Sequence, residues 1–291
     1  MKLHLLDGTY ELFRSFYGAP GRTSPEGREV GATYGIMAST MALLSQPDVT
    51  HLGAAFDSVI ESYRNDIFPG YKSSAGMEPS LLQQFPLAEE GLRAMGVVVW
   101  SMYEFETDDA LATAANRWAD EVDQVVVLTP DKDMAQLYGH PNVVGYERRN
   151  QKEVDELQVI EKFGVVPESI PDYLALVGDS ADGYPGLPGW GAKSAGAVLA
   201  RYGHLEDIPL EAARWDVAVR GADKLAATLR AGIGDALLYR FLATLRRDVP
   251  LTETLADLEW PGVPRDPFDE FCELHGFESL ADRVPRWNPE P

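Results

Sequence analysis

Short apolar runs recur through the first half of the chain. Each run holds four or five residues. The runs 3–6, 97–100 and 125–128 are too short for helices and rich in residues that favour strands. Longer stretches between the runs have apolar residues at helical spacing. This alternation is typical of an α/β domain with a twisted, mainly parallel sheet flanked by helices. The expected strands are 3–6, 52–56, 97–100, 125–128 and 143–146, and the expected helices are 33–44, 80–95 and 108–122.

The strand pattern stops near residue 150, and helical patterns dominate from residue 153 onward. We therefore expect an α/β core at 1–150 and a helical region at 151–291 that packs on it, because no linker rich in proline or serine separates them. The segment 69–78 is rich in turn-forming residues and is expected to be mobile. The helices expected in the second half are 153–163, 172–178, 192–201, 222–231 and 235–246.

Nine carboxylates form five short clusters, and four of the clusters directly follow apolar runs. The carboxyl ends of parallel strands share one rim of an open sheet, so these acids are expected to converge. Carboxylates in one place repel one another unless cations lie between them, and oxygen ligands suit Mg²⁺ or Mn²⁺ and not Zn²⁺. The pattern predicts a multi-metal phosphodiester site. The nine acids are Asp7, Asp57, Glu106, Asp108, Asp109, Asp131, Asp133, Asp179 and Asp182.

Simpler roles compete for several of these acids. Asp131 and Asp133 follow an apolar strand and could form a solvated turn that caps a helix. Asp179 and Asp182 could form a plain acidic turn. The glycine and glutamate spacings of an EF-hand are missing there, which excludes a calcium loop of that type.

Glu106, Asp108 and Asp109 stand at the start of a helical pattern. Acids at this position cap the helix and complement its dipole, so at least one of the three can be structural. Glu106 and Asp108 precede the helix and are the better ligand candidates. Asp109 is expected to reach a metal through water.

A glycine-rich segment follows the last acidic pair. It nearly matches a P-loop, but one extra residue, Ala192, precedes Lys193, and a helical pattern in place of a strand comes before it. Backbone amides at a glycine turn that opens a helix can instead hold one DNA phosphate without reading sequence, as in a helix-hairpin-helix motif. We expect this motif near 172–203. Its DNA-binding candidates are Gly186, Gly189, Trp190, Gly191, Lys193 and Ser194.

The net charge of −21 is unusual for a protein that binds a polyanion. The charge is unevenly distributed: it is −16 over residues 1–182, +2 over 183–250 and −7 over 251–291. Metal ions would neutralise the nine clustered acids of the first segment. The middle of the second half is therefore the best candidate surface for DNA, although the acidic balance predicts weak, salt-sensitive binding.

The remaining composition fits a cytoplasmic protein. The one cysteine, Cys272, allows no internal disulfide and suits a reducing compartment. No apolar stretch of 18 residues occurs, so no membrane span is expected. The histidines show no ligand spacing, and no serine or cysteine nucleophile motif is evident, which argues against covalent catalysis.

In order and spacing, these motifs resemble the 5′ nuclease (flap endonuclease-like) family, which includes the 5′-3′ exonuclease domain of bacterial DNA polymerase I. The resemblance covers nearly the whole chain and is closest to the stand-alone form. The motifs are Leu5-Leu6-Asp7-Gly8, Phe56-Asp57, Tyr63-Arg64, Gly70-Tyr71-Lys72, 105–109, 129–133, Gly178-Asp179 with Asp182, Gly189-Trp190-Gly191 with Lys193, and 247–251.

The resemblance implies a PIN-like 5′ nuclease with two or three Mg²⁺ or Mn²⁺ ions held by the nine acids, and K⁺ at the hairpin. It implies 5′ flap endonuclease and 5′→3′ exonuclease activity in replication and repair. The substrate would be DNA with a free 5′ end, a flap or a nicked duplex, and the protein would be a monomer. Lys72, in the family's arch near 69–90, would stabilise charge on the phosphate, and Arg64 is a second candidate for this role.

Departures from the family pattern keep other functions open. Ala75 stands where an arginine is usual, Gly183 where asparagine is common, and Pro188 and Trp190 replace the usual hairpin residues. These changes concern phosphate contacts and catalytic rate. One alternative is a non-catalytic or weakly active module that binds branched DNA. A second is an RNA-directed nuclease with a similar acidic site.

Overall fold

The computed structural model describes residues 1–289 and divides the chain into two compact units. The first unit contains Met1–Ser62, Ser74–Thr129 and the residues from Arg247 onward. The second contains Tyr63–Ser73 and Pro130–Arg246. Both units are thus built from segments that are not consecutive in the sequence, whereas the sequence pattern suggested one division near residue 150.

Four parallel strands form the sheet of the first unit, in the order β3-β2-β1-β4. Leu5 of β1 lies between Gly53 of β2 and Val127 of β4. Every residue of β2 is buried, as expected for a parallel strand that is covered on both faces. The four strands expected in this part are confirmed, with bounds Lys2–Asp7 (β1), His51–Asp57 (β2), Val98–Met102 (β3) and Gln124–Leu128 (β4).

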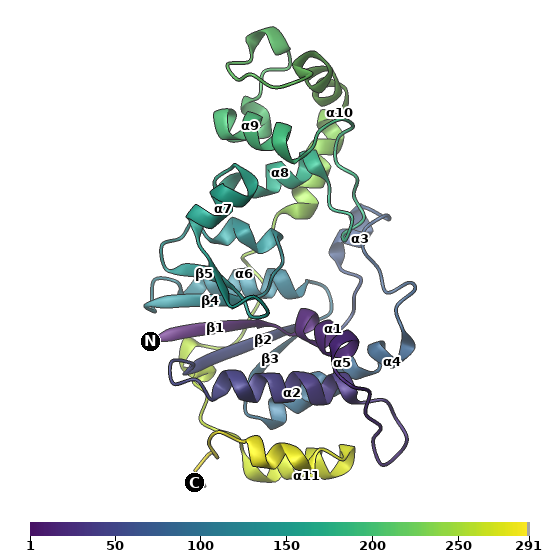
Figure 1. Cartoon of the computed structure of the whole chain (residues 1–291), viewed down its shortest axis with the longest axis vertical. Coiled ribbons are helices and arrows are strands. Elements are labelled where there is room, and N and C mark those ends of the chain that lie inside the picture. Colours follow the sequence, from purple (N-terminus) through teal and green to yellow (C-terminus); the bar gives the residue numbers. More distant parts are fainter. Residues whose placement is uncertain (290–291) are drawn as a thin grey trace. The chain divides into compact units, whose positions relative to one another are not determined.

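Helices cover this sheet, and they enclose the core (Figure 1). Across the sheet, the chain steps from β1 to β2 and then to β3 in one direction. It then returns past β1 to reach β4, which is a step in the opposite direction. Right-handed crossovers therefore place α1, α2 and α5 on one face and α6 on the opposite face. The bounds are Gly8–Gly18 (α1), Gly31–Leu44 (α2), Pro79–Leu82 (α4), Gln84–Ala94 (α5), Thr107–Trp118 (α6) and Arg265–His275 (α11).

Two differences from the expected elements have physical causes. The expected helix 80–95 is two helices, α4 and α5, that meet at Gln83. The helices α1 and α11 were not predicted. α1 begins directly after β1 without a loop, and α11 is strongly acidic, so its apolar stripe is narrow. α11 packs against α5 and extends the helical layer on that face.

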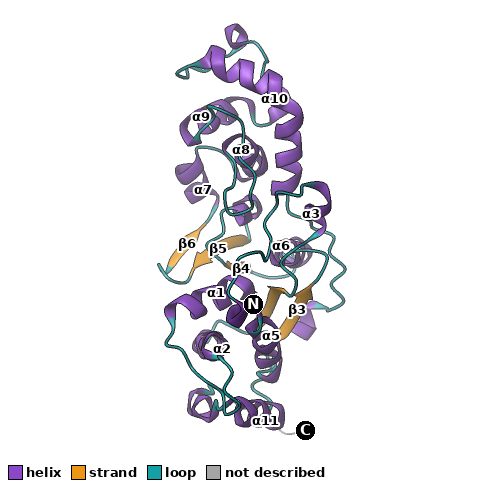
Figure 2. Ribbon diagram, turned by 90° about the vertical axis from the view of Figure 1, so that its right-hand side faces the viewer, coloured by secondary structure: helices purple, strands orange, loops and turns teal. Residues whose placement is uncertain are grey.

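The second unit is mostly helical. The helix α10 runs beside α8, and α9 packs on the other side of α8 (Figure 2). The unit also holds an antiparallel pair, β5 and β6. The strand β6 was missed because it has three residues, and the expectation that strands end before residue 153 was wrong. The bounds are Tyr63–Ile67 (α3), Val143–Glu147 (β5), Lys152–Val154 (β6), Glu156–Phe163 (α7), Ile170–Val177 (α8), Ala192–Tyr202 (α9) and Ala222–Ala243 (α10).

The helix α10 joins two helices that the sequence predicted separately. Its backbone leaves helical geometry at Gly232, where φ is −111° and ψ is 19°. A Cβ atom at Gly232 would lie 2.9 Å from the side chain of Leu187, so glycine lets the helix pass the hairpin closely. Among the residues described, no helix is long and apolar enough to cross a membrane.

Short 3₁₀ helices complete the described elements. One of them, Asp133–Leu137, carries an acid of the predicted site directly after β4. The others are Pro167–Ser169, Leu205–Asp207, Ala212–Arg214, Leu255–Leu258 and Glu278–Arg283.

Candidate metal centre and hairpin

Asp7 lies at the end of β1 in the first unit. Strand order reverses between β1 and β4, and ligands of open α/β sheets bind at such a switch point. One carboxylate oxygen of Asp7 accepts a hydrogen bond from the Tyr10 amide at 2.8 Å and so caps α1. The other accepts from the Thr129 hydroxyl, just after β4, at 2.7 Å. The fold thus holds this carboxylate at the switch point in a fixed orientation.

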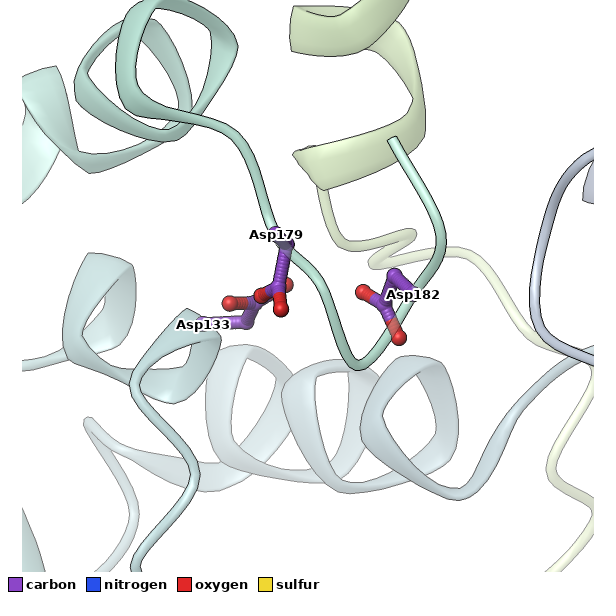
Figure 3. Close-up of side chains that lie close together, drawn as sticks. All are labelled: Asp133, Asp179 and Asp182. Atoms are coloured by element: carbon purple, nitrogen blue, oxygen red, sulfur yellow. The ribbon is translucent and has the colours of Figure 1, made fainter. Parts of the chain in front are cut away.

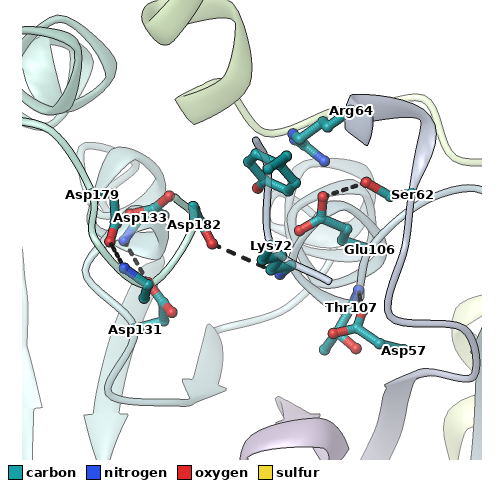
Figure 4. Close-up of polar contacts among 12 residues, drawn as sticks. Asp57, Ser62, Arg64, Lys72, Glu106, Thr107, Asp131, Asp133, Asp179 and Asp182 are labelled. Carbon is teal, nitrogen blue, oxygen red and sulfur yellow. Dashed lines mark hydrogen bonds and ion pairs between the residues drawn. The ribbon is translucent and has the colours of Figure 1, made fainter. Parts of the chain in front are cut away.

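Asp57 and Glu106 are two further buried acids of the first unit, each held by a neighbouring donor (Figure 4). Asp57 ends β2 and accepts a 2.6 Å hydrogen bond from the Thr107 amide at the start of α6. Glu106 accepts a 2.6 Å hydrogen bond from the hydroxyl of Ser62. The serine and threonine partners were not identified from the sequence, because they come from segments distant in the chain.

Asp109 has a structural function in this unit. Its side chain is fully buried, and one oxygen accepts a 3.1 Å hydrogen bond from the Glu106 amide, as in a capping box. Asp108, beside it, is half-buried. The alternative that at least one acid at the start of α6 caps the helix therefore applies to Asp109.

Three acids of the second unit lie together: Asp133, Asp179 and Asp182 (Figure 3). Each offers an oxygen within 4.8 Å of the oxygens of the other two, and no other set of three potential ligands within the described residues does so. Asp133 begins the 3₁₀ helix after β4, and the other two lie in the turn after α8. Asp131 is exposed and accepts the Asp133 amide at 2.9 Å, which shapes the loop.

The buried oxygen Oδ1 of Asp133 has no hydrogen-bond partner among the described residues. Burial, together with the charges of Asp131, Asp182 and Asp179, raises the pKa of Asp133 well above its ordinary value. An unpartnered buried carboxylate oxygen is costly, and a bound cation would remove that cost. Three oxygen donors around one point fit a hard divalent ion such as Mg²⁺ or Mn²⁺.

Two lysines contact this acidic cluster. The ammonium of Lys132 lies 2.6 Å from Oδ2 of Asp179, and that of Lys72 lies 4.0 Å from Oδ1 of Asp182. Partial burial alone would lower the pKa of Lys132, but its hydrogen bond to Asp179 and the nearby acids raise it above the ordinary value. Lys132 lies inside one of the motifs seen in the sequence, but no function was predicted for it. Its position between two acidic residues was the signal that could have identified it.

The segment Tyr63–Ser73 is fixed closely to the acidic turn of the second unit. The Lys72 amide donates to the Asp182 carbonyl at 3.0 Å. Gly183 has a φ of +86°, and a Cβ atom there would lie 2.2 Å from the Gly70 carbonyl oxygen. Glycine at 183, one of the departures from the family pattern, is therefore required by this close approach.

Arg64, a candidate for phosphate binding, is almost fully buried. Its Nε donates to the Leu242 carbonyl at 2.8 Å, and its Nη2 donates to the Thr244 carbonyl at 3.0 Å. These bonds secure α3 to the end of α10. Because Arg64 is buried whereas Lys72 is partly exposed, Lys72 is the better placed of the two candidates to meet a phosphate.

The glycines of the hairpin between α8 and α9 differ in how much space surrounds them. Gly191 has extended geometry, and a Cβ atom there would meet nothing within 4 Å. Gly189 and Lys193 are exposed. Gly186, by contrast, packs within the fold, since a Cβ atom there would lie 2.4 Å from the Gly178 nitrogen.

Trp190 and Ser194 stabilise the hairpin from within. Trp190 is buried, and its indole nitrogen lies 3.3 Å from the Leu225 carbonyl and 3.2 Å from the Thr228 hydroxyl of α10. The Ser194 hydroxyl accepts the Gly191 amide at 3.1 Å and caps α9. The surface that remains open to a ligand is therefore formed by Gly189 and Lys193, which are exposed, and by the half-buried Gly191.

Solved structures with the same fold include two from bacteriophage T5. The D15 protein, co-crystallised with metal ions, has a TM-score of 0.69 at 16% sequence identity, over 97% of this chain and 99% of that one. The T5 flap endonuclease, solved as a pseudo-enzyme–product complex with DNA and metal ions, has a TM-score of 0.68 at 18% identity, over 98% and 100%. At these identities the likeness shows the fold, and it confirms the predicted fold class.

Sequence comparison gives the family. A profile of the 5′-3′ exonuclease N-terminal resolvase-like domain matches residues 2–164, and one of the 5′-3′ exonuclease C-terminal SAM fold matches residues 165–266. The 5′-3′ exonuclease of Aquifex aeolicus is 34% identical over 207 residues, which is 71% of each chain. DNA polymerase I of Mycobacterium tuberculosis is 35% identical over 97% of this chain, which spans 31% of the polymerase. The chain belongs to the 5′-3′ exonuclease family, as its motifs predicted.

Proposed function

We propose that this chain is a divalent-metal-dependent, structure-specific nuclease that cleaves DNA with a free 5′ end, as a 5′ flap endonuclease and 5′→3′ exonuclease. Family membership supports the reaction class. The observation that carries the proposal is the cluster of Asp133, Asp179 and Asp182 with its unpartnered buried oxygen. A cation would be expected to occupy this cluster in the working enzyme.

The acids of both units are the proposed metal ligands. Asp7, Asp57, Glu106 and Asp108 would serve in the first unit, with Asp109 acting through water or as a helix cap. Bound Mg²⁺ or Mn²⁺, two or three ions in all, would polarise a phosphate and lower the pKa of a bound water. Asp131, Asp133, Asp179 and Asp182 would serve in the second unit.

The remaining functional groups would bind and orient DNA. Lys72 is half-buried and could move from Asp182 to a phosphate oxygen when the substrate arrives. The amides of Gly189 and Gly191 and the ammonium of Lys193 would hold a phosphate of the duplex. K⁺ at the hairpin carbonyls is part of the same proposal. The substrates would be 5′ flaps, nicked duplexes and free 5′ ends, in replication and repair.

Cleavage of a labelled 5′-flap duplex with Mg²⁺ or Mn²⁺ tests the function, with EDTA as the metal-free control. Asp133→Asn should reduce the single-turnover rate by at least a hundredfold, because it removes the charge of a buried ligand candidate. The matched control is Asp207→Asn, an exposed acid of the second unit that should cleave normally.

Three results would redirect the proposal. Retained cleavage in Asp133→Asn would remove this residue from the site. Tight binding of the flap without cleavage in any divalent metal would favour a branched-DNA-binding module. Faster cleavage of a matched RNA flap than of the DNA flap would favour an RNA-directed nuclease.

A further inference from the structure

We propose that Lys132 is a built-in counter-cation of the acidic cluster, which holds Asp179 in the absence of metal and competes with a divalent ion for it. Lys132 would thereby set the metal affinity of the cluster as a positioning residue. The inference rests on the proposed metal site and assigns it a regulator that is part of the chain.

The first support is the full use of both Asp179 oxygens. Oδ2 lies 2.6 Å from the Lys132 ammonium, and Oδ1 accepts the Ala181 amide at 3.0 Å. The backbone of Asp179 is fixed by reciprocal hydrogen bonds with Tyr184 at 2.9 and 3.0 Å. Because Oδ2 holds the lysine ammonium at close range, a metal ion that takes Oδ2 as a ligand competes with Lys132 for it.

The second support is the difference in burial across this ion pair. The Asp179 side chain is 4% exposed, whereas the Lys132 side chain is 37% exposed. A buried carboxylate needs a partner, but the lysine has a route to solvent and can leave without being stranded. The pair is therefore suited to exchange its ammonium for another cation.

The third support is the charge of the cluster. The carboxylates of Asp133, Asp179 and Asp182 repel one another, and the monovalent ammonium of Lys132 offsets only part of that repulsion. A divalent ion in its place would offset more of it. Lys72 is 4.0 Å from its carboxylate, beyond hydrogen-bond length, so Lys132 is the stronger competitor.

Replacing the lysine should change metal binding and metal-free stability in opposite directions. Lys132→Met, studied without DNA, should bind Mg²⁺ or Mn²⁺ about three- to tenfold more tightly, as expected for loss of one half-exposed competing ion pair. Its melting temperature in EDTA should fall, because Asp179 loses its partner. Its metal-induced rise in melting temperature should exceed that of the wild type. Lys132→Arg keeps the charge and should behave like the wild type.

Lys2→Met is the matched control, because Lys2 also pairs with one aspartate, at 3.0 Å, and is 39% exposed. It should leave metal affinity unchanged. A purely structural function of Lys132 would lower the melting temperature equally with and without metal, and that result would overturn the proposal. If Mg²⁺ and Mn²⁺ neither change the melting temperature of the wild type nor give a measurable heat of binding, the proposed metal site itself is contradicted.

A measurement on the unmodified protein covers the case in which Lys132→Met does not fold. Acetylation of individual lysines, followed by mass spectrometry, should show faster reaction at Lys132 when Mg²⁺ is added, because the ammonium leaves Asp179. The rate at Lys2 should not change. If a metal ion binds to the protein and the acetylation rate at Lys132 is the same with and without it, the proposed exchange of the ammonium for the metal is contradicted.

Discussion

The buried histidine His4 makes the stability of the first unit depend on pH. His4 lies within β1, is 5% exposed, and its Nδ1 has no hydrogen-bond partner among the described residues. Burial lowers its pKa from 6.5 to about 4. As pH falls, the unfolded chain takes up a proton first, so the stability contributed by neutral His4 is lost between about pH 6.5 and pH 4.

The change from pH 7.5 to pH 5 should cost about 2 kcal/mol of unfolding free energy through His4 alone. His4→Leu should remove that part of the pH dependence, because it fills the position without titrating. Urea denaturation of both proteins at the two pH values measures the difference. Equal losses in wild type and His4→Leu would show that His4 is not the group responsible.

Gly183 provides a second residue-scale prediction. Its φ is +86°, and a Cβ atom there would lie 2.2 Å from the Gly70 carbonyl oxygen, so no side chain fits. Gly183→Ala should reduce the unfolding free energy by about 1–2 kcal/mol. Gly191→Ala, where the backbone is extended and the space is open, should have little effect. Equal stability of both variants, measured by denaturation, would contradict the close approach.

The positions of Asp7 and Asp57 at strand ends were predictable from the sequence, and the hydrogen-bond partners of the acids were not. Asp7 and Asp57 could be placed because carboxyl ends of parallel strands share one edge of a sheet. The donors Thr129 and Ser62 could not, because a hydroxyl after a strand has many local uses and no spacing that marks it. The burial that isolates Oδ1 of Asp133 depends on packing, which the sequence does not display.

At the scale of elements, the periodicity of apolar residues predicted the helices and strands whose buried positions repeat regularly. All five expected strands exist, because each is an uninterrupted apolar run. The break between α4 and α5, the short β6 and the continuity of α10 through Gly232 depend on local contacts. Gly232 reads as a helix end in sequence, but its contact with Leu187 makes it a bend within one helix.

The hairpin element can be tested with a variant that the fold should accept. Gly191 has a φ of −150° and a ψ of 174°, which a β-branched residue adopts readily, and no atom lies near its Cβ position. Gly191→Val should therefore fold normally but obstruct a phosphate that approaches the amides. We expect at least a fivefold loss of duplex affinity, measured with Ca²⁺ in place of the catalytic ion.

Single-strand binding and Gly234→Ala are the controls for this hairpin variant. Single-strand affinity should change much less than duplex affinity. Gly234 lies on α10 with nothing near its Cβ position, so Gly234→Ala should leave both affinities unchanged. A similar loss on both DNAs in Gly191→Val would place duplex recognition elsewhere.

At the scale of the whole molecule, the net charge of −21 produces self-repulsion in the folded state. In EDTA, raising NaCl from 20 to 300 mM should increase the melting temperature by roughly 3–6 °C, since the Debye length shortens from about 20 to 6 Å. Differential scanning fluorimetry measures the shift. Screening should saturate within this range, so a rise that continues linearly toward 1 M salt would indicate preferential exclusion of salt instead.

The interleaving of the two units determines when the protein can fold during synthesis. The first unit needs α11, which packs on α5, and Trp260, whose indole donates to the Met95 carbonyl at 2.8 Å. Roughly 170 residues, including most of the second unit, separate α5 from α11. A ribosome adding about 5–20 residues per second takes roughly 10–35 s over that interval. The sheet of the first unit is synthesised early. One of its helical layers therefore stays incomplete until most of the second unit has been synthesised and α11 has emerged.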